Sequence, residues 1–205
     1  MIRFRPGMPA EFQRTVRHPL RPILPRSGLY YVSHVDGREV ADRFAEQFAA
    51  TWRRIPIGAR RRVLHYWRTF DFGIVPLMAI PTIELSPCWA TRQNGTIIKQ
   101  PLGFCTAIGT MLRFWEPAVR LLPDDHLHTL IAHELGHVFL KAVGQNDPSY
   151  GSKSEADNAF GEEIDVYETI MDWGFDDDAL DAWVRSDAPE AIKLRRLQTE
   201  LDDDG

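Results

Sequence analysis

His133-Glu134-Leu135-Gly136-His137 is the stretch of this 205-residue chain that says most about its fold and chemistry. Two histidines four residues apart on an α-helix lie one above the other on the same face, so both imidazoles can reach one metal ion. Glu134 projects toward the same place but is one position away from the row of ligands. It therefore suits a general base acting on metal-bound water better than a ligand. The stretch matches the HExxH pattern, whose two histidines bind zinc.

The residues around this motif have the spacing of a helix. Asp124 or Asp125, after Pro123, is expected to cap the helix at its N-terminus, and Gly144 is expected to end it. Apolar residues recur between them at helical intervals: Leu127, Leu130, Ile131, Val138 and Leu140. The competing interpretation is an ordinary amphipathic helix, which leaves the joint occurrence of two histidines, a glutamate and a small glycine unexplained.

Length and composition predict one globular domain, with 44% hydrophobic and 26% charged residues. No apolar run approaches the ~18 to 20 residues needed to span a bilayer, and no signal-peptide pattern is present. The only two cysteines, Cys88 and Cys105, are compatible with a reducing compartment. We therefore expect a cytoplasmic protein that makes no membrane contact.

The chain is expected to consist of an extended or disordered arm (1–28) and a single domain (29–205). Within the domain we expect a helical N-terminal part (29–70), a catalytic core (72–175) and C-terminal helices (176–205).

Charge is distributed unevenly along the chain. Residues 1–70 hold 14 basic and 5 acidic residues, whereas residues 71–205 hold 10 basic and 24 acidic ones, for a net charge of −5. We expect the basic part to pack against the acidic part of the same chain. Contact with nucleic acid or an acidic partner through Arg60, Arg61 and Arg62 is the less favoured interpretation.

The order of the expected elements predicts an α+β fold with a small, twisted, mostly antiparallel sheet. Helical spacing runs from Gly37 to Trp52 and again through Val63 and Trp67, with a break at Ile55-Pro56-Ile57-Gly58. The period then shortens toward two, and Asn94-Gly95 marks a tight turn. Strands are expected at residues 72–80, 82–85, 88–89, 96–98 and 106–114. Two further helices are expected around residues 179–184 and 189–201.

A return helix is expected to supply the third metal ligand. It begins at Ser154 or Glu155 after a loop at residues 145–154, and ends at Trp173 before Gly174. Glu163 falls within an apolar stripe on this helix, between Phe160 and Tyr167. The stripe is formed by Ala156, Ala159, Phe160, Ile164, Tyr167, Ile170 and Met171. A carboxylate facing a core is unfavourable unless something compensates it, and a metal ion would do so. We therefore expect Glu163 as the ligand, with Glu155 and Glu162 as alternatives. An ion pair between Glu163 and an arginine is the competing interpretation, because it would compensate the carboxylate without a metal ion.

The motif, the loop and the second helix resemble the gluzincin branch of the zincins. With Trp173-Gly174-Phe175, they are most similar to the ImmA/IrrE-like and related minimal metallopeptidases over residues 72–175. The second helix of those families often reads Glu-x-x-Ala-Asn/Asp, whereas this chain has Glu163-Ile164-Asp165-Val166-Tyr167. The resemblance implies a sheet packed on the active-site helix, with an edge strand that can hold an extended peptide. Residues 106–115 are the candidate edge, unless they form an ordinary structural strand.

These observations lead us to expect a zinc-dependent metallopeptidase acting on a peptide or protein substrate. His133, His137 and Glu163 would hold Zn²⁺, and Glu134 would take a proton from the attacking water and pass it to the leaving amine. Tyr150 and Tyr167 are candidate donors to an oxyanion, although each is more simply explained as structural. One alternative is a regulatory, DNA-binding or protein-binding protein that retains a zincin scaffold. A purely structural zinc is another, which Glu134 argues against.

Overall fold

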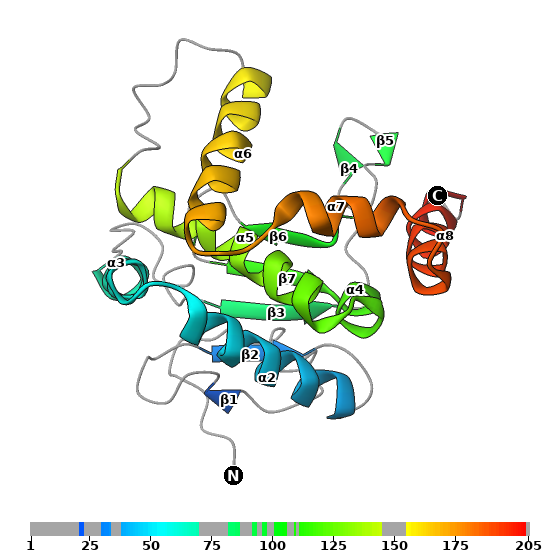
Figure 1. The fold of residues 1–205 in the computed structure, drawn as a ribbon, viewed down its shortest axis with the longest axis horizontal. Helices are drawn as coiled ribbons and strands as arrows, with labels where there is room; N and C mark the ends of the chain where they lie inside the picture. The colour runs from blue at the N-terminus through cyan, green and yellow to red at the C-terminus, as the bar shows by residue number, and fades with distance from the viewer. Residues whose placement is uncertain are drawn as a thin grey trace.

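One long helix, α5 (Asp124–Ala142), lies near the centre of the computed structural model of the chain (Figure 1). The structure describes residues 21–22, 30–33, 38–69, 82–86, 92–93, 96–97, 101–105, 109, 111–144 and 155–203. Helices and strands within these residues form an α+β fold, as expected from the sequence. The fold places the HExxH motif in the second half of α5.

A five-stranded sheet lies beside this helix, with the strand order β1-β2-β3-β7-β6. The prediction of a mostly antiparallel sheet is wrong, because β2–β3 and β3–β7, the central pairs, are parallel, while β1–β2 and β6–β7 are antiparallel. Helices α2 and α3 lie between β2 and β3 in the chain, and such crossovers join parallel strands. The strands are β1 (Arg21–Pro22), β2 (Tyr30–Ser33), β3 (Thr82–Ser86), β6 (Gly103–Cys105) and β7 (Met111–Trp115).

The edge of the sheet nearest the motif is β6, not the strand expected from the sequence. β7 pairs with β3 on one side and with β6 on the other, so the prediction that residues 106–115 form the edge is wrong. β6 has three residues, too few to show a strand period in the sequence. The short strand β6 therefore lies outside β7 and ends the order of the described strands.

A separate two-stranded sheet confirms the predicted tight turn, although its first strand is not the one expected. β4 (Arg92–Gln93) pairs antiparallel with β5 (Thr96–Ile97), on either side of Asn94-Gly95. The strands expected at residues 72–80 and 88–89 lie outside the described residues.

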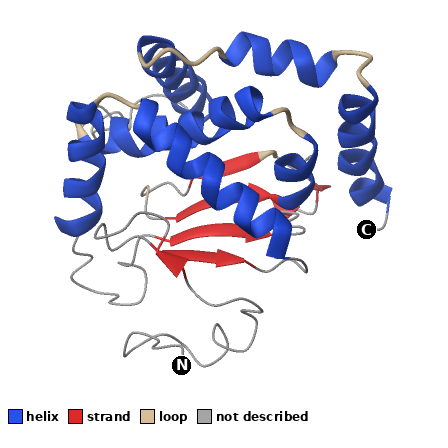
Figure 2. Cartoon of the chain, turned by 60° about the horizontal axis from the view of Figure 1, so that its bottom comes forward, coloured by secondary structure: helices blue, strands red, loops and turns tan. Residues whose placement is uncertain are grey.

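The hydrophobic core lies between the five-stranded sheet and the helices, which gather on one side of it (Figure 2). Phe44 of α2 packs against Phe114 of β7, with ring centroids 4.9 Å apart. The ring of Phe48 lies 6.0 Å from that of Phe44 and is tilted by 56° to it. The sheet adds Ile83, Leu85 and Leu112. The buried face of α5 completes the core with Leu127, Ile131 and Leu135. This packing fixes the position of α5 against the sheet, where the helix contacts β6.

The remaining helices confirm the helical predictions. α2 (Arg38–Arg54) and α3 (Ile57–Thr69) are separated by Ile55-Pro56, and both pack on α5. The short α4 (Glu116–Leu121) follows β7. The return helix α6 (Glu155–Asp172) is followed by Gly174 with φ of 83°, and the C-terminal helices are α7 (Asp177–Arg185) and α8 (Pro189–Asp203).

Candidate metal centre

The two histidines of the motif lie on one face of α5, with ring centroids 5.0 Å apart. The helix begins at Asp124, and its N-cap, Pro123, makes no side-chain hydrogen bond. The prediction that Asp124 or Asp125 caps the helix is wrong, because both lie inside its first turn. Their charges there are favourable toward the positive end of the helix dipole. Gly144, with φ of 73°, follows the C-terminus as expected.

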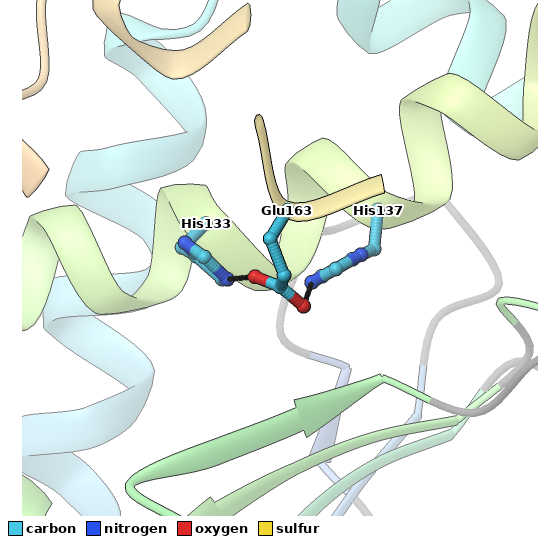
Figure 3. Close-up of side chains that lie close together, drawn as sticks. All are labelled: His133, His137 and Glu163. Carbon is cyan, nitrogen blue, oxygen red and sulfur yellow. Dashed lines mark ion pairs between the residues drawn. The ribbon is translucent and has the colours of Figure 1, made fainter. Parts of the chain in front are cut away.

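His133, His137 and Glu163 converge on one point between α5 and α6 (Figure 3). Nε2 of His133 is 3.1 Å from one carboxylate oxygen of Glu163, and Nε2 of His137 is 3.5 Å from the other. One ligand atom from each residue lies within 4.8 Å of the others. Tetrahedral zinc, with bonds of ~2.0–2.1 Å, places its ligand atoms about 3.3 Å apart. In the part of the chain that the structure describes, this is the one group of such residues close enough to hold a metal ion.

The other ring nitrogen of each histidine faces a second carboxylate. Nδ1 of His133 is 3.1 Å from Oδ2 of Asp177, and Nδ1 of His137 is 2.8 Å from Oε1 of Glu162. Glu162 is also paired with the buried ammonium of Lys141. A carboxylate at Nδ1 accepts the N–H from that nitrogen, which leaves the lone pair of Nε2 free for a metal. Both histidines are therefore held with Nδ1 toward a carboxylate and Nε2 toward Glu163, which is the orientation of metal ligands.

The charges of these carboxylates favour a cation at the centre. Burial alone would lower the pKa of His133, but hydrogen bonds with Asp177 and Glu163 and the charge of Glu134 raise it to about 10. The hydrogen bond from His137 lowers the pKa of Glu162 to about 2; burial opposes this shift and Lys141 reinforces it. Burial raises the pKa of Glu163, but the two histidines outweigh it and the net shift is downward. Either a proton on His133 or a metal ion would compensate the negative charge of these carboxylates.

Glu134 lies buried beside the converging ligands, with 4% of its surface exposed. Its Oε2 has no hydrogen-bond partner among the described residues, and burial raises its pKa while His133 and His137 oppose the shift. A buried carboxylate oxygen without a partner is unfavourable, and a water molecule on a metal at this point would supply one. The donor set and this oxygen together fit a bound metal ion with a water ligand.

The surroundings of Glu163 differ from the expected ones. Its side chain is 54% exposed, so the prediction that it faces an apolar core is wrong. The face of α6 that packs on α5 is formed by Val166 and Ile170, whereas Ile164 and Met171, both in the predicted stripe, are 45% exposed. α6 therefore has apolar residues on two faces, and Glu163 lies at the boundary between them.

The two alternative ligands lie differently. Glu162 uses its carboxylate on His137 Nδ1 and Lys141, on the side of the imidazole away from Glu163. Glu155 is the first residue of α6, eight positions and thus about 12 Å along the helix from Glu163, and its side chain lies outside the described residues. Of the carboxylates proposed as the third ligand, the structure brings Glu163 to the two Nε2 atoms.

Other candidate residues do not reach this point. The hydroxyl of Tyr167 donates to Asp178 at 2.8 Å, which supports its structural interpretation, and Tyr150 lies outside the described residues. Burial raises the pKa of the Cys105 thiol, on β6.

Sequence reasoning missed three residues around the site. Asp177 is 44 positions from His133, and no local pattern connects them. Lys141 follows His137 by one helical turn, which is the one sequence signal that could have indicated it. Gly103 lies against Glu134, and only the strand arrangement reveals it.

Comparison of the chain with models of protein families, with curated proteins and with solved structures finds no match. Within the described residues, no helix combines the length and apolar character needed to cross a bilayer.

Proposed function

We propose that the protein is a zinc-dependent metallopeptidase with a zincin-like fold. The observation that carries the proposal is the convergence of two imidazole nitrogens and one carboxylate beside buried Glu134, whose Oε2 has no hydrogen-bond partner among the described residues. Three protein ligands leave a fourth position open for water, which is typical of catalytic zinc. A structural zinc site normally has four protein ligands instead.

The proposed roles follow from the positions of the side chains. His133, His137 and Glu163 would hold the ion, whose chemistry is to lower the pKa of a bound water toward ~7 and to polarise a carbonyl. Glu134 accepts a proton from the attacking water, then donates it to the leaving amine nitrogen. Its burial, which raises its pKa, favours the protonated form that the second step requires.

An extended peptide is the substrate that the sheet favours. β6 ends the order of the described strands and lies against α5, so a peptide added along it would pass close to Glu134. Backbone hydrogen bonds to such an edge hold a peptide independently of its sequence. The exposed Phe104 on β6 offers apolar contact to a substrate side chain.

Zinc content and peptide hydrolysis of the full chain test this proposal. We expect about one zinc per chain and cleavage of an unstructured protein such as casein. Glu134→Gln should keep the zinc and reduce kcat by about 10²- to 10⁴-fold, because the amide cannot accept the proton. Glu168→Gln, an exposed position on α6, is the matched control and should leave both quantities unchanged. Substoichiometric zinc, or unchanged hydrolysis in Glu134→Gln, would contradict the proposal.

A further inference from the structure

Asp177 reaches His133 from a helix that supplies no ligand. It is the first residue of α7, and its Oδ2 lies 3.1 Å from Nδ1 of His133. Asp176, immediately before it, caps α7 by accepting a hydrogen bond from the backbone N–H of Ala179 at 2.9 Å. The carboxylate that orients His133 is thus carried at a well-defined helix start.

Arg54, the last residue of α2, contacts the turn that precedes Asp177. Its guanidinium donates to the carbonyl of Gly174 at 3.3 Å and lies over the ring of Phe175, 4.3 Å from the centroid. The Phe175 side chain is itself buried in the core. A third contact, 3.1 Å from Nη1 to Nδ1 of His128, ties Arg54 to α5. Arg54 therefore links α2, α5 and the turn that carries Asp177.

We propose that Asp177 is a positioning residue for His133, and that Arg54 fixes the turn that presents it. The inference rests on the proposed zinc site. Asp177 would keep the proton of His133 on Nδ1 and the lone pair of Nε2 aimed at the ion. Arg54 would act indirectly. In this turn it contacts Gly174 and Phe175, which precede Asp177 by three and two residues, and not Asp177 itself. α2 and α7 then belong to the metal centre although neither contacts the ion.

Zinc affinity of the full chain, measured by competition with a chromophoric chelator, tests the role of Asp177. Asp177→Ala should weaken zinc binding by about 10- to 100-fold. Asp177→Asn should lose less, because its amide oxygen still accepts the hydrogen bond from Nδ1 but carries no charge. Asp181→Asn changes an exposed aspartate of the same helix, paired with Arg185, and is the matched control expected to bind zinc like the wild type.

The absorption spectrum of the Co²⁺-loaded chain distinguishes positioning from general stability. Asp177→Ala should shift the ligand-field bands. It should also lower the unfolding midpoint of the metal-free protein, because the carboxylate of Asp177 pairs with His133 there, so the spectrum is the measurement that identifies positioning. A purely structural residue would change the midpoint and leave the spectrum alone. If Asp177→Ala does not fold, Asp177→Asn, which keeps the shape of the side chain, decides the question by the same two measurements.

A double-mutant cycle tests the role of Arg54. Arg54→Ala should weaken zinc binding several-fold in the wild type but add little in the Asp177→Ala background, because its effect passes through Asp177. Zinc affinity of Asp177→Ala within two-fold of the wild type, with an unchanged Co²⁺ spectrum, would overturn the role of Asp177. Fully additive effects would overturn that of Arg54. A wild-type chain that binds no zinc would instead overturn the proposed function itself.

Discussion

At residue 103 the sheet has room for glycine alone. A Cβ placed there would lie 2.4 Å from Oε1 of Glu134, far inside contact distance. Glu134 is buried, so its carboxylate cannot simply turn into solvent. The absence of a side chain at Gly103 therefore sets where the proposed general base lies.

Gly103→Ala should separate catalysis from metal binding. The new methyl group would displace the Glu134 carboxylate, and a shift of about 1 Å in a catalytic group can cost ~10²-fold in rate. We expect kcat for casein hydrolysis to fall by at least about 10-fold, with zinc affinity within two-fold of the wild type. Gly58→Ala, where an added Cβ meets nothing within 4 Å, is the control and should keep full activity. Equal activity of the two variants would show that Gly103 does not constrain Glu134.

The sequence could indicate the residues of the centre better than their surroundings. His133, Glu134 and His137 stand in a fixed local spacing, which any helix converts into one face. For Glu163, the helical period predicts a side chain that faces an apolar core, yet half of this side chain is exposed. Asp177 approaches from another helix, and only the path of the chain between α6 and α7 brings it there. Contacts between distant elements leave no local pattern to read.

Between elements, α5 and α6 approach each other closely at Gly136. A Cβ there would lie 3.0 Å from Cγ1 of Val166 and 3.2 Å from Cγ2 of Ile170. Glu163 precedes Val166 by one helical turn, so the distance between the two helices also sets the distance from Glu163 to the histidines. Gly136, the third residue after the first histidine of the motif, is thus where α6, the helix that carries Glu163, packs on α5.

Gly136→Val should weaken the centre by moving α6. The larger side chain cannot fit against Val166 and Ile170, and overpacking of this kind costs typically about 1–3 kcal/mol. We expect zinc affinity to fall by at least about 10-fold, measured by chelator competition, because α6 carries Glu163 away from α5. Adding Val166→Ala should restore part of the loss by returning the space. Gly161→Ala, an open position on α6, should bind zinc normally; zinc binding by Gly136→Val equal to this control would show that helix spacing does not matter.

The pattern of elements was predictable from the sequence, and their pairing was not. Helical periods located α2, α3, α5 and α6 because each buries one face. The direction of β2, β3 and β7 depends on crossovers far along the chain, which a strand of alternating residues does not reveal. On α6, periodicity found an apolar stripe but could not distinguish the face of Val166 and Ile170, which packs on α5, from that of Ile164 and Met171.

Across the whole molecule, His128 joins α5 to α2 in a way that depends on pH. Its Nε2 lies 2.6 Å from Oε1 of Gln47, and its Nδ1 lies next to the guanidinium of Arg54. The guanidinium of Arg54 can only donate, so Nδ1 accepts, and the amide oxygen of Gln47 can only accept, so Nε2–H donates. A ring with one accepting and one donating nitrogen is a neutral imidazole. Burial, followed by the charge of Arg54, lowers its pKa below 6.5, and Asp125 and Asp124 oppose the shift.

His128 should make the fold less stable in acid. Because its pKa is lower in the folded chain, the unfolded chain takes up the proton first as the pH falls. Its contribution to the free energy of unfolding is therefore present above pH 6.5, the ordinary pKa, and is lost as the pH falls toward the folded value. Urea unfolding of the metal-free chain from about pH 7.5 to about pH 5 should show a shallower pH dependence for His128→Gln than for the wild type. His126→Gln is the control, and equal slopes for all three proteins would contradict this assignment.

The division of the three candidate ligands between α5 and α6 has a consequence for folding itself. His137 and Glu163 are 26 positions apart, and only packed helices bring their ligand atoms together. An unfolded chain could offer an ion little more than scattered side chains, so zinc would bind the native state by strong preference. At free zinc one hundred times the Kd, mass action would add about 2.7 kcal/mol to the free energy of unfolding. The zinc concentration around the protein would then be one of the variables that determine how much of it is folded.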